Sequence, residues 1–169
     1  MSNLLATLGQ QNEITSGIGI QEEAVINFNG NQAGDPGAVG LYKIFRVNGL
    51  VSAQVYAFVE NDLIGSSATI SVGVQREAHA GGGSDSTAAF IASTTASQLN
   101  TSEIWYGASP QAVFIANTVT NFPALVISRD ITISVGTAAI TSGRIRFVCL
   151  WKPISVGSSV VARLAGAIT

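Results

Sequence analysis

The sequence predicts an all-β protein, a two-sheet antiparallel β-sandwich of jelly-roll-like type with extended N- and C-terminal arms. From Ile18 onward, β-branched and aromatic residues alternate with polar or small ones, as expected of strands that bury one face. About eight or nine such runs are separated by turn signals every 8–15 residues or so, which is typical of sandwiches and barrels. Helical periodicity is nearly absent.

The chain length predicts a single domain. Its 169 residues lie within the range of one soluble domain. The strand pattern fills residues 18–153, and Pro153 is expected to stop further ladder pairing in mid-sheet. Residues 1–17 and 154–169 are polar, small or weakly apolar, so we assign them to an N-terminal and a C-terminal arm.

An Asn48-Gly49 pair predicts a hairpin in the first half of the chain. It lies between a strand at 41–47 and a second strand at 50–59. Asn-Gly is the strongest short-range hairpin signal, because a type I′ turn needs positive φ at both central residues. A further turn at 60–62 is expected to end the second strand.

A second hairpin is predicted near the C-terminus, where an alternating strand at 130–135 is expected to pair with 144–151 through the connection 136–143. The pentapeptide Thr-Ile-Ser-Val-Gly occurs twice, and its two copies are either sheet neighbours or lie across the sandwich. The remaining predictions are strands at 67–75, 88–92, 102–106, 113–116 and 124–127, a short helical turn within 93–101 and an exposed loop tip at 78–87.

Charge is scarce, and this restricts the classes of function. Charged residues make up 11% of the chain, against about 25% in ordinary domains, and the formal net charge is −2. AVILMFWYC residues make up 47%, which excludes intrinsic disorder, and the lack of a basic excess gives no support to nucleic-acid binding. So few charges on a near-neutral chain indicate a protein that resides in an assembly.

Cysteine content and hydropathy point to synthesis in the cytosol. The lone Cys149 closes no internal disulfide and, within an apolar run, is expected to be a buried core thiol. The N-terminus lacks the basic region and long apolar stretch of a secretory signal. No run of 18 apolar residues predicts a membrane span.

No constellation of residues predicts an enzyme, a metal site or a cofactor site. The chain has one histidine, His79, and one cysteine, too few for a zinc site. A Ser-His-Asp trio drawn from the Gly-rich loop around His79 would lack the fixed orientation that catalysis needs. The paired carboxylates Glu22-Glu23 and Glu60 with Asp62 are better explained as solvated surface and turn residues than as a glycosidase pair.

Arg144 and Arg146 alternate on one face of the last predicted strand, with Lys152 beyond them. Either these cations contact a partner, or they form the solvated face of an edge strand, where charge prevents aggregation; we favour the second explanation. The aromatic residues within strand patterns are expected in the core rather than on a sugar-binding platform: Trp105, Tyr106, Phe147 and Trp151.

Two segments, DITISVGTAAITSGRIRFVCLWKPIS at 130–155 and LYKIFRVNGLVSAQVYAFV at 41–59, resemble structural proteins of tailed-bacteriophage virions. The proteins that they resemble are small, jelly-roll-like and all-β, and they decorate or cement the capsid shell. The resemblance implies a homotrimer that clamps neighbouring major capsid protein subunits, with arms reaching across the shell. It also implies assembly in the host cytoplasm and a final location on the virion.

The resulting hypothesis is a non-enzymatic virion component without nucleic-acid or membrane partners. The candidate partner contacts are Leu4, Leu5 and Leu8 in the N-terminal arm, together with Arg144, Arg146 and Lys152. The alternative is a carbohydrate- or receptor-binding sandwich of a tail or fibre, in which Trp105 and Tyr106 would stack on sugar. A hydrolase on a jelly-roll scaffold is a third hypothesis, and the scarcity of polar residues argues against it.

Overall fold

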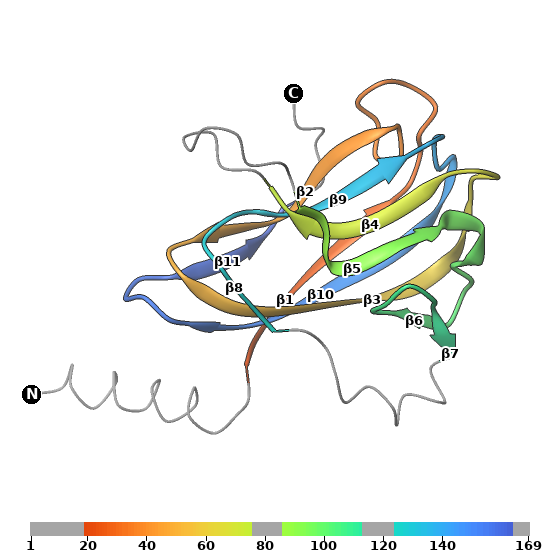
Figure 1. Cartoon of the computed structure of the whole chain (residues 1–169). Helices are drawn as coiled ribbons and strands as arrows, with labels where there is room; N and C mark the ends of the chain where they lie inside the picture. The colour runs from red at the N-terminus through yellow and green to blue at the C-terminus, as the bar shows by residue number, and fades with distance from the viewer. Residues whose placement is uncertain (1–18, 76–85, 113–123, 164–169) are drawn as a thin grey trace, which may run out of the picture.

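A computed structural model describes residues 19–75, 86–112 and 124–163 as a sandwich of two antiparallel sheets (Figure 1). The strands and the single 3₁₀ turn are β1 (Ile20–Asn27), β2 (Gly40–Asn48), β3 (Val51–Ile64), β4 (Thr69–Val74), β5 (Ser86–Thr95), η1 (Ala96–Gln98), β6 (Glu103–Trp105), β7 (Gln111–Ala112), β8 (Leu125–Ile127), β9 (Ile131–Gly136), β10 (Ser142–Pro153) and β11 (Ser159–Ala162).

The strand order is that of a jelly roll. One sheet has the order β1-β10-β3-β6-β7, with β8 also paired to β3, and the other has the order β11-β2-β9-β4-β5. Successive strands from β1 to β4 alternate between the two sheets, and the chain changes sheet again between β9 and β10. The predicted two-sheet antiparallel sandwich is therefore confirmed.

The core lies between the two sheets and follows from alternation along the strands. In β3 the inward residues are buried, whereas the residues between them stay partly exposed over most of the strand. The largest fully buried side chains come from both sheets and from two connections between strands: Trp105, Tyr42, Phe45, Phe147, Ile44, Ile70, Ile91, Leu99, Ile131, Ile133, Ile140 and Ile145.

Both predicted hairpins are wrong. Asn48-Gly49 does reverse the chain, with Gly49 at φ +70°. However, β2 pairs with β9 and β11, whereas β3 pairs with β10, β6 and β8. The connection between β9 and β10 likewise links the two sheets. Both turns carry the chain from one sheet to the other, so the strands that they join share no ladder and each adds its apolar face to the core between the sheets.

The two Thr-Ile-Ser-Val-Gly segments are neighbours in one sheet. Strands β4 and β9 run antiparallel, and the register pairs each pentapeptide with the other along its whole length, centred on Ser71 opposite Ser134. Ile70 lies opposite Val135, and Val72 lies opposite Ile133, all four buried. This arrangement decides between the two placements that the sequence left open.

Strand β3 does not end at the turn expected at 60–62. It continues to Ile64, and its register with β10 is interrupted by a bulge around Arg144. The bulge lets β3 continue past a local irregularity, so the polar run Glu60-Asn61-Asp62 lies inside the strand.

The expected C-terminal arm is partly a strand. Residues 159–162 form β11, which pairs with β2, and Val160 is buried. The sandwich therefore extends beyond the boundary expected at 153, because a short apolar run fills the edge of the second sheet.

Turn η1 falls within 93–101, where a helical turn was expected. The expected strand at 113–116 and the loop tip at 78–85 lie outside the described residues, whereas Ser86 and Thr87 begin β5.

Candidate functional site

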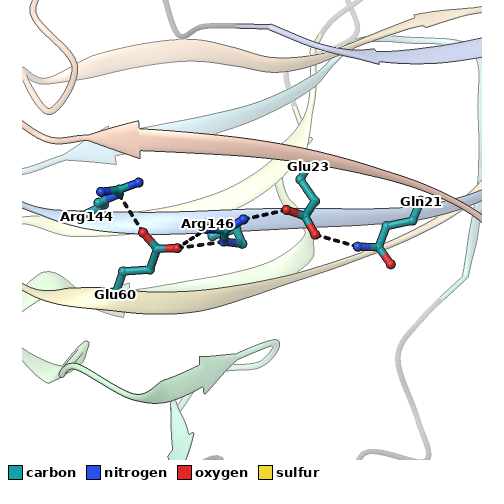
Figure 2. Close-up of polar contacts among 5 residues, drawn as sticks. All are labelled: Gln21, Glu23, Glu60, Arg144 and Arg146. Atoms are coloured by element: carbon teal, nitrogen blue, oxygen red, sulfur yellow. Dashed lines mark hydrogen bonds and ion pairs between the residues drawn. The ribbon is translucent and has the colours of Figure 1, made fainter.

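A charged network lies on the outer face of the β1-β10-β3 sheet (Figure 2). Arg146 on β10 lies between Glu23 on β1 and Glu60 on β3. Its Nη1 is 2.7 Å from Glu23 Oε2 and its Nη2 is 2.7 Å from Glu60 Oε1. Glu60 Oε2 is 2.6 Å from Arg144 Nε, and Gln21 donates a 2.6 Å hydrogen bond to Glu23.

These positions overturn the edge-strand explanation for the two arginines. Strand β10 is paired on both sides, by β1 and by β3. Arg146 therefore contacts carboxylates on both neighbouring strands, and Arg144 contacts the one on β3, so neither lies at a sheet edge. The sequence could not indicate this, because Glu23 and Glu60 are far from Arg146 along the chain.

The electrostatics of the network keep its charges in place. The hydrogen bond from Arg146, aided by Gln21, lowers the pKa of Glu23. The hydrogen bonds to Glu23 and Glu60 raise the pKa of Arg146. Charge-assisted hydrogen bonds from Arg146 to Glu23 and Glu60 thus link the three strands β1, β10 and β3.

Asp62, the other carboxylate of the Glu60–Asp62 pair, has a separate partner. Thr101 donates two hydrogen bonds of 2.6 Å to Asp62 Oδ1, from its backbone amide and from its hydroxyl. The hydroxyl bond and then the amide bond lower the pKa of Asp62. Asp62 therefore anchors the connection after η1, while Glu60 binds the arginines.

The structure does not bring the remaining candidate contacts into this network. Lys152 lies near the far end of β10, opposite Ser52. Six residues of extended strand separate it from Arg146, a span of about 20 Å. Leu4, Leu5 and Leu8 lie outside the described residues.

Two further features were missed by the sequence analysis. One is a pocket of about 200 Å³ on the same outer face, lined by residues of β3 and β10 and by the chain just before β1 and β8. The other is an exposed apolar tip formed by Leu50, Ile154 and Val156. The alternation of apolar and polar residues in Ile154-Ser155-Val156 could have indicated this exposed tip, but residues 154–169 were predicted to be an arm.

Cys149 and most of the strand aromatics belong to the core. Cys149 is fully buried, and burial, with a smaller effect of Glu22, raises its thiol pKa to about 12. The thiol is therefore protonated and shielded at neutral pH. Trp105, Phe147 and Trp151 are buried as expected, and Tyr106 is partly exposed.

Within the described ranges no group of three or more His, Cys, Asp or Glu side chains is placed to hold a metal ion. His79 lies outside these ranges. None of the helices that the structure describes has the length and apolarity to cross a membrane. No family model, curated protein or solved structure matches the chain.

Proposed function

We propose that this chain is a non-enzymatic structural protein of a tailed-phage virion that decorates or cements the capsid shell. It would do so by bridging major capsid protein subunits, with the N-terminal arm as the anchor. One observation carries the proposal best, the character of the outward residues on strands β4 and β9.

These two strands direct only hydroxyls and glycines away from the core. The positions that alternate with the buried Ile and Val of the paired pentapeptides are Thr69, Ser71, Gly73, Thr132, Ser134 and Gly136. Of these, Thr69, Ser134 and Gly136 are partly exposed, whereas Ser71, Gly73 and Thr132 are buried. The charged side chain that the paired strand β2 adds beside Thr132 is Lys43, and it is paired with Asp130 at 2.9 Å. The exposed part of the two strands, Thr69, Ser134 and Gly136, is uncharged, so packing it against another subunit dehydrates no ion.

Two further considerations favour this role. Jelly rolls are frequent in viral capsid and lectin domains, although a fold alone does not determine function. The resemblance of 41–59 and 130–155 to virion proteins favours a viral capsid protein over a lectin domain. The homotrimer and the threefold shell position that the resemblance implies stay predictions.

The alternative of a sugar-binding tail or fibre protein loses the residue pair on which it was based. Trp105 is fully buried on the inner face of β6. It therefore has no surface on which a sugar could stack beside Tyr106.

Deleting residues 1–12 tests the proposal. We expect the truncated chain to lose its place on purified particles, because the anchoring leucines are gone, while its melting transition stays that of the full chain. The matched variant Leu4→Ser/Leu5→Ser/Leu8→Ser keeps the arm length and is expected to lose occupancy as well. Unchanged occupancy of the truncated chain, measured by quantitative mass spectrometry of particles, would contradict the assignment.

A further inference from the structure

The chain contains two Asn-Gly pairs, and Asn-Gly is the dipeptide most prone to spontaneous deamidation. The pairs are Asn29-Gly30, in the loop after β1, and Asn48-Gly49, at the turn between β2 and β3. Deamidation begins when the backbone nitrogen of the following residue attacks the side-chain amide carbon, and glycine, which has no Cβ, hinders this attack least. Both asparagines are exposed, so the state of the glycine amide distinguishes the two sites.

The Asn29-Gly30 pair is held in place by hydrogen bonds. The Gly30 amide donates to the Ile140 carbonyl at 2.9 Å, and the Asn29 carbonyl accepts from the Asn31 amide at 2.8 Å. A Cβ on Gly30 would lie 2.5 Å from the backbone of Gly37, so this loop is packed closely against its neighbours. The Gly30 nitrogen can turn toward the Asn29 side chain only after its hydrogen bond to the buried Ile140 is broken.

The Asn48-Gly49 pair lacks this restraint. Within the residues that the structure describes, the Gly49 amide has no hydrogen-bond partner. Asn48 is the last residue of β2, and it pairs with Ser159, the first residue of β11. Strand β11 has four residues and lies at the edge of its sheet, so this terminal rung opens at little cost. The attacking nitrogen at this site is therefore available in the folded protein.

We propose that Asn48 is a modification site, which deamidates through Gly49 in the folded protein while Asn29 is protected. The Gly49 nitrogen bonds to Cγ of Asn48, the Cγ–Nδ2 bond breaks, and the proton of the Gly49 amide passes through solvent to the departing group, which leaves as ammonia. Water then opens the succinimide ring at either carbonyl and gives aspartate or isoaspartate. The net reaction consumes one water and needs no other reactant, and the new carboxylate adds one negative charge to a chain of formal net charge −2.

The two products differ in their effect on β11. Asn48 Nδ2 donates to Ser159 Oγ at 3.3 Å, and an aspartate there can instead accept from that hydroxyl. In isoaspartate the main chain runs through the former side chain and gains one carbon, so the rung between positions 48 and 159 loses its register. We expect the isoaspartyl form to release β11 from β2 and to expose Val160, which is buried in the unmodified protein. This inference does not depend on the proposed function.

Incubation of the full chain in mildly alkaline buffer, followed by proteolysis and mass spectrometry, tests the proposal. Cleavage after Lys43 and Arg46 places the two pairs in different peptides, and labelling with an isoaspartyl methyltransferase identifies isoaspartate. In the native protein we expect Asn48 to react at least about fivefold faster than Asn29, the factor that corresponds to one hydrogen bond of about 1 kcal/mol. In guanidinium, where both pairs are unfolded, this advantage is expected to disappear.

The variant Gly37→Ala tests the cause of the protection. A Cβ on Gly37 would lie 2.4 Å from the Ile140 carbonyl oxygen, which is the acceptor of the Gly30 amide. We expect this variant to deamidate faster at Asn29, with an unchanged rate at Asn48 as the sign that the rest of the sandwich is folded. An Asn29 rate that stays at the wild-type value would contradict protection by this hydrogen bond.

The variant Asn48→Asp is the matched control for the effect on β11, because it carries the new charge without the altered main chain. Hydrogen exchange of residues 159–162 is expected to be unchanged in Asn48→Asp and faster in the isoaspartyl fraction of the wild type. Equal exchange in the two would overturn the release of β11. An unmodified Asn48 in the native protein, equal native rates at Asn48 and Asn29, or a rate difference that persists in guanidinium would each overturn the modification site itself.

Discussion

Phe147→Ala is expected to destabilise the protein by about 3–5 kcal/mol, the usual cost of emptying a large aromatic site in a core. Phe147 is fully buried at the centre of β10. Its ladder partners on both sides are alanines, Ala24 on β1 and Ala57 on β3. The neighbouring side chains are too small to fill the space that the ring would leave, so the cavity persists.

Phe58→Ala is the matched control, because it removes the same ring from the opposite face of the adjacent strand. Phe58 is partly exposed and makes an edge contact with Tyr56 at 5.6 Å between ring centroids. We expect a loss of about 1 kcal/mol from this variant. Guanidinium unfolding at one fixed protein concentration measures both losses, and equal losses would contradict the assignment of Phe147 to the core.

Gly37→Ala is expected to cost about 2–4 kcal/mol, because strain and lost hydrogen bonds add together. Gly37 has φ +102°, and a Cβ there would lie 2.4 Å from the Ile140 carbonyl oxygen. That carbonyl accepts from the Gly30 amide at 2.9 Å, and the Ile140 amide donates to Gly37 at 2.8 Å. An alanine at this position would push the loop before β2 away from the connection that leads into β10.

Gly34→Ala separates the two causes. Gly34 also has a positive φ, +91°, but a Cβ there would meet nothing within 4 Å. It should therefore show only the backbone strain, about 1 kcal/mol. Thermal unfolding of the two variants compares them directly. If Gly37→Ala and Gly34→Ala lower the free energy of unfolding equally, the close packing at Gly37 contributes nothing to stability.

The fold class was predictable because alternation is a local property that a sandwich uses on nearly every strand. Strand β3 shows this, since its small and branched inward residues alternate with polar or aromatic outward ones over most of its length. Strand pairing was not predictable in the same way. The Asn48-Gly49 pair predicts that the chain reverses direction. Whether the two flanking strands pair as a hairpin or enter different sheets depends on which other strands cover their apolar faces.

The charged network and the apolar tip depend on contacts between distant parts of the chain. Arg146 meets carboxylates supplied by Glu23 and Glu60, and no spacing rule connects the three. The apolar tip was hidden because Pro153 was taken as the end of the sandwich. In the structure Pro153 ends β10 and the chain then turns into β11, so the tip is a turn between two strands.

The proposed role of this chain is that of a building block of a capsid shell. Counting its copies in purified particles, by quantitative mass spectrometry against the major capsid protein, tests this most directly. We expect a copy number that rises in proportion to that of the shell subunit, as for a protein bound at repeated shell positions. A handful of copies confined to the tail, or none, would contradict it.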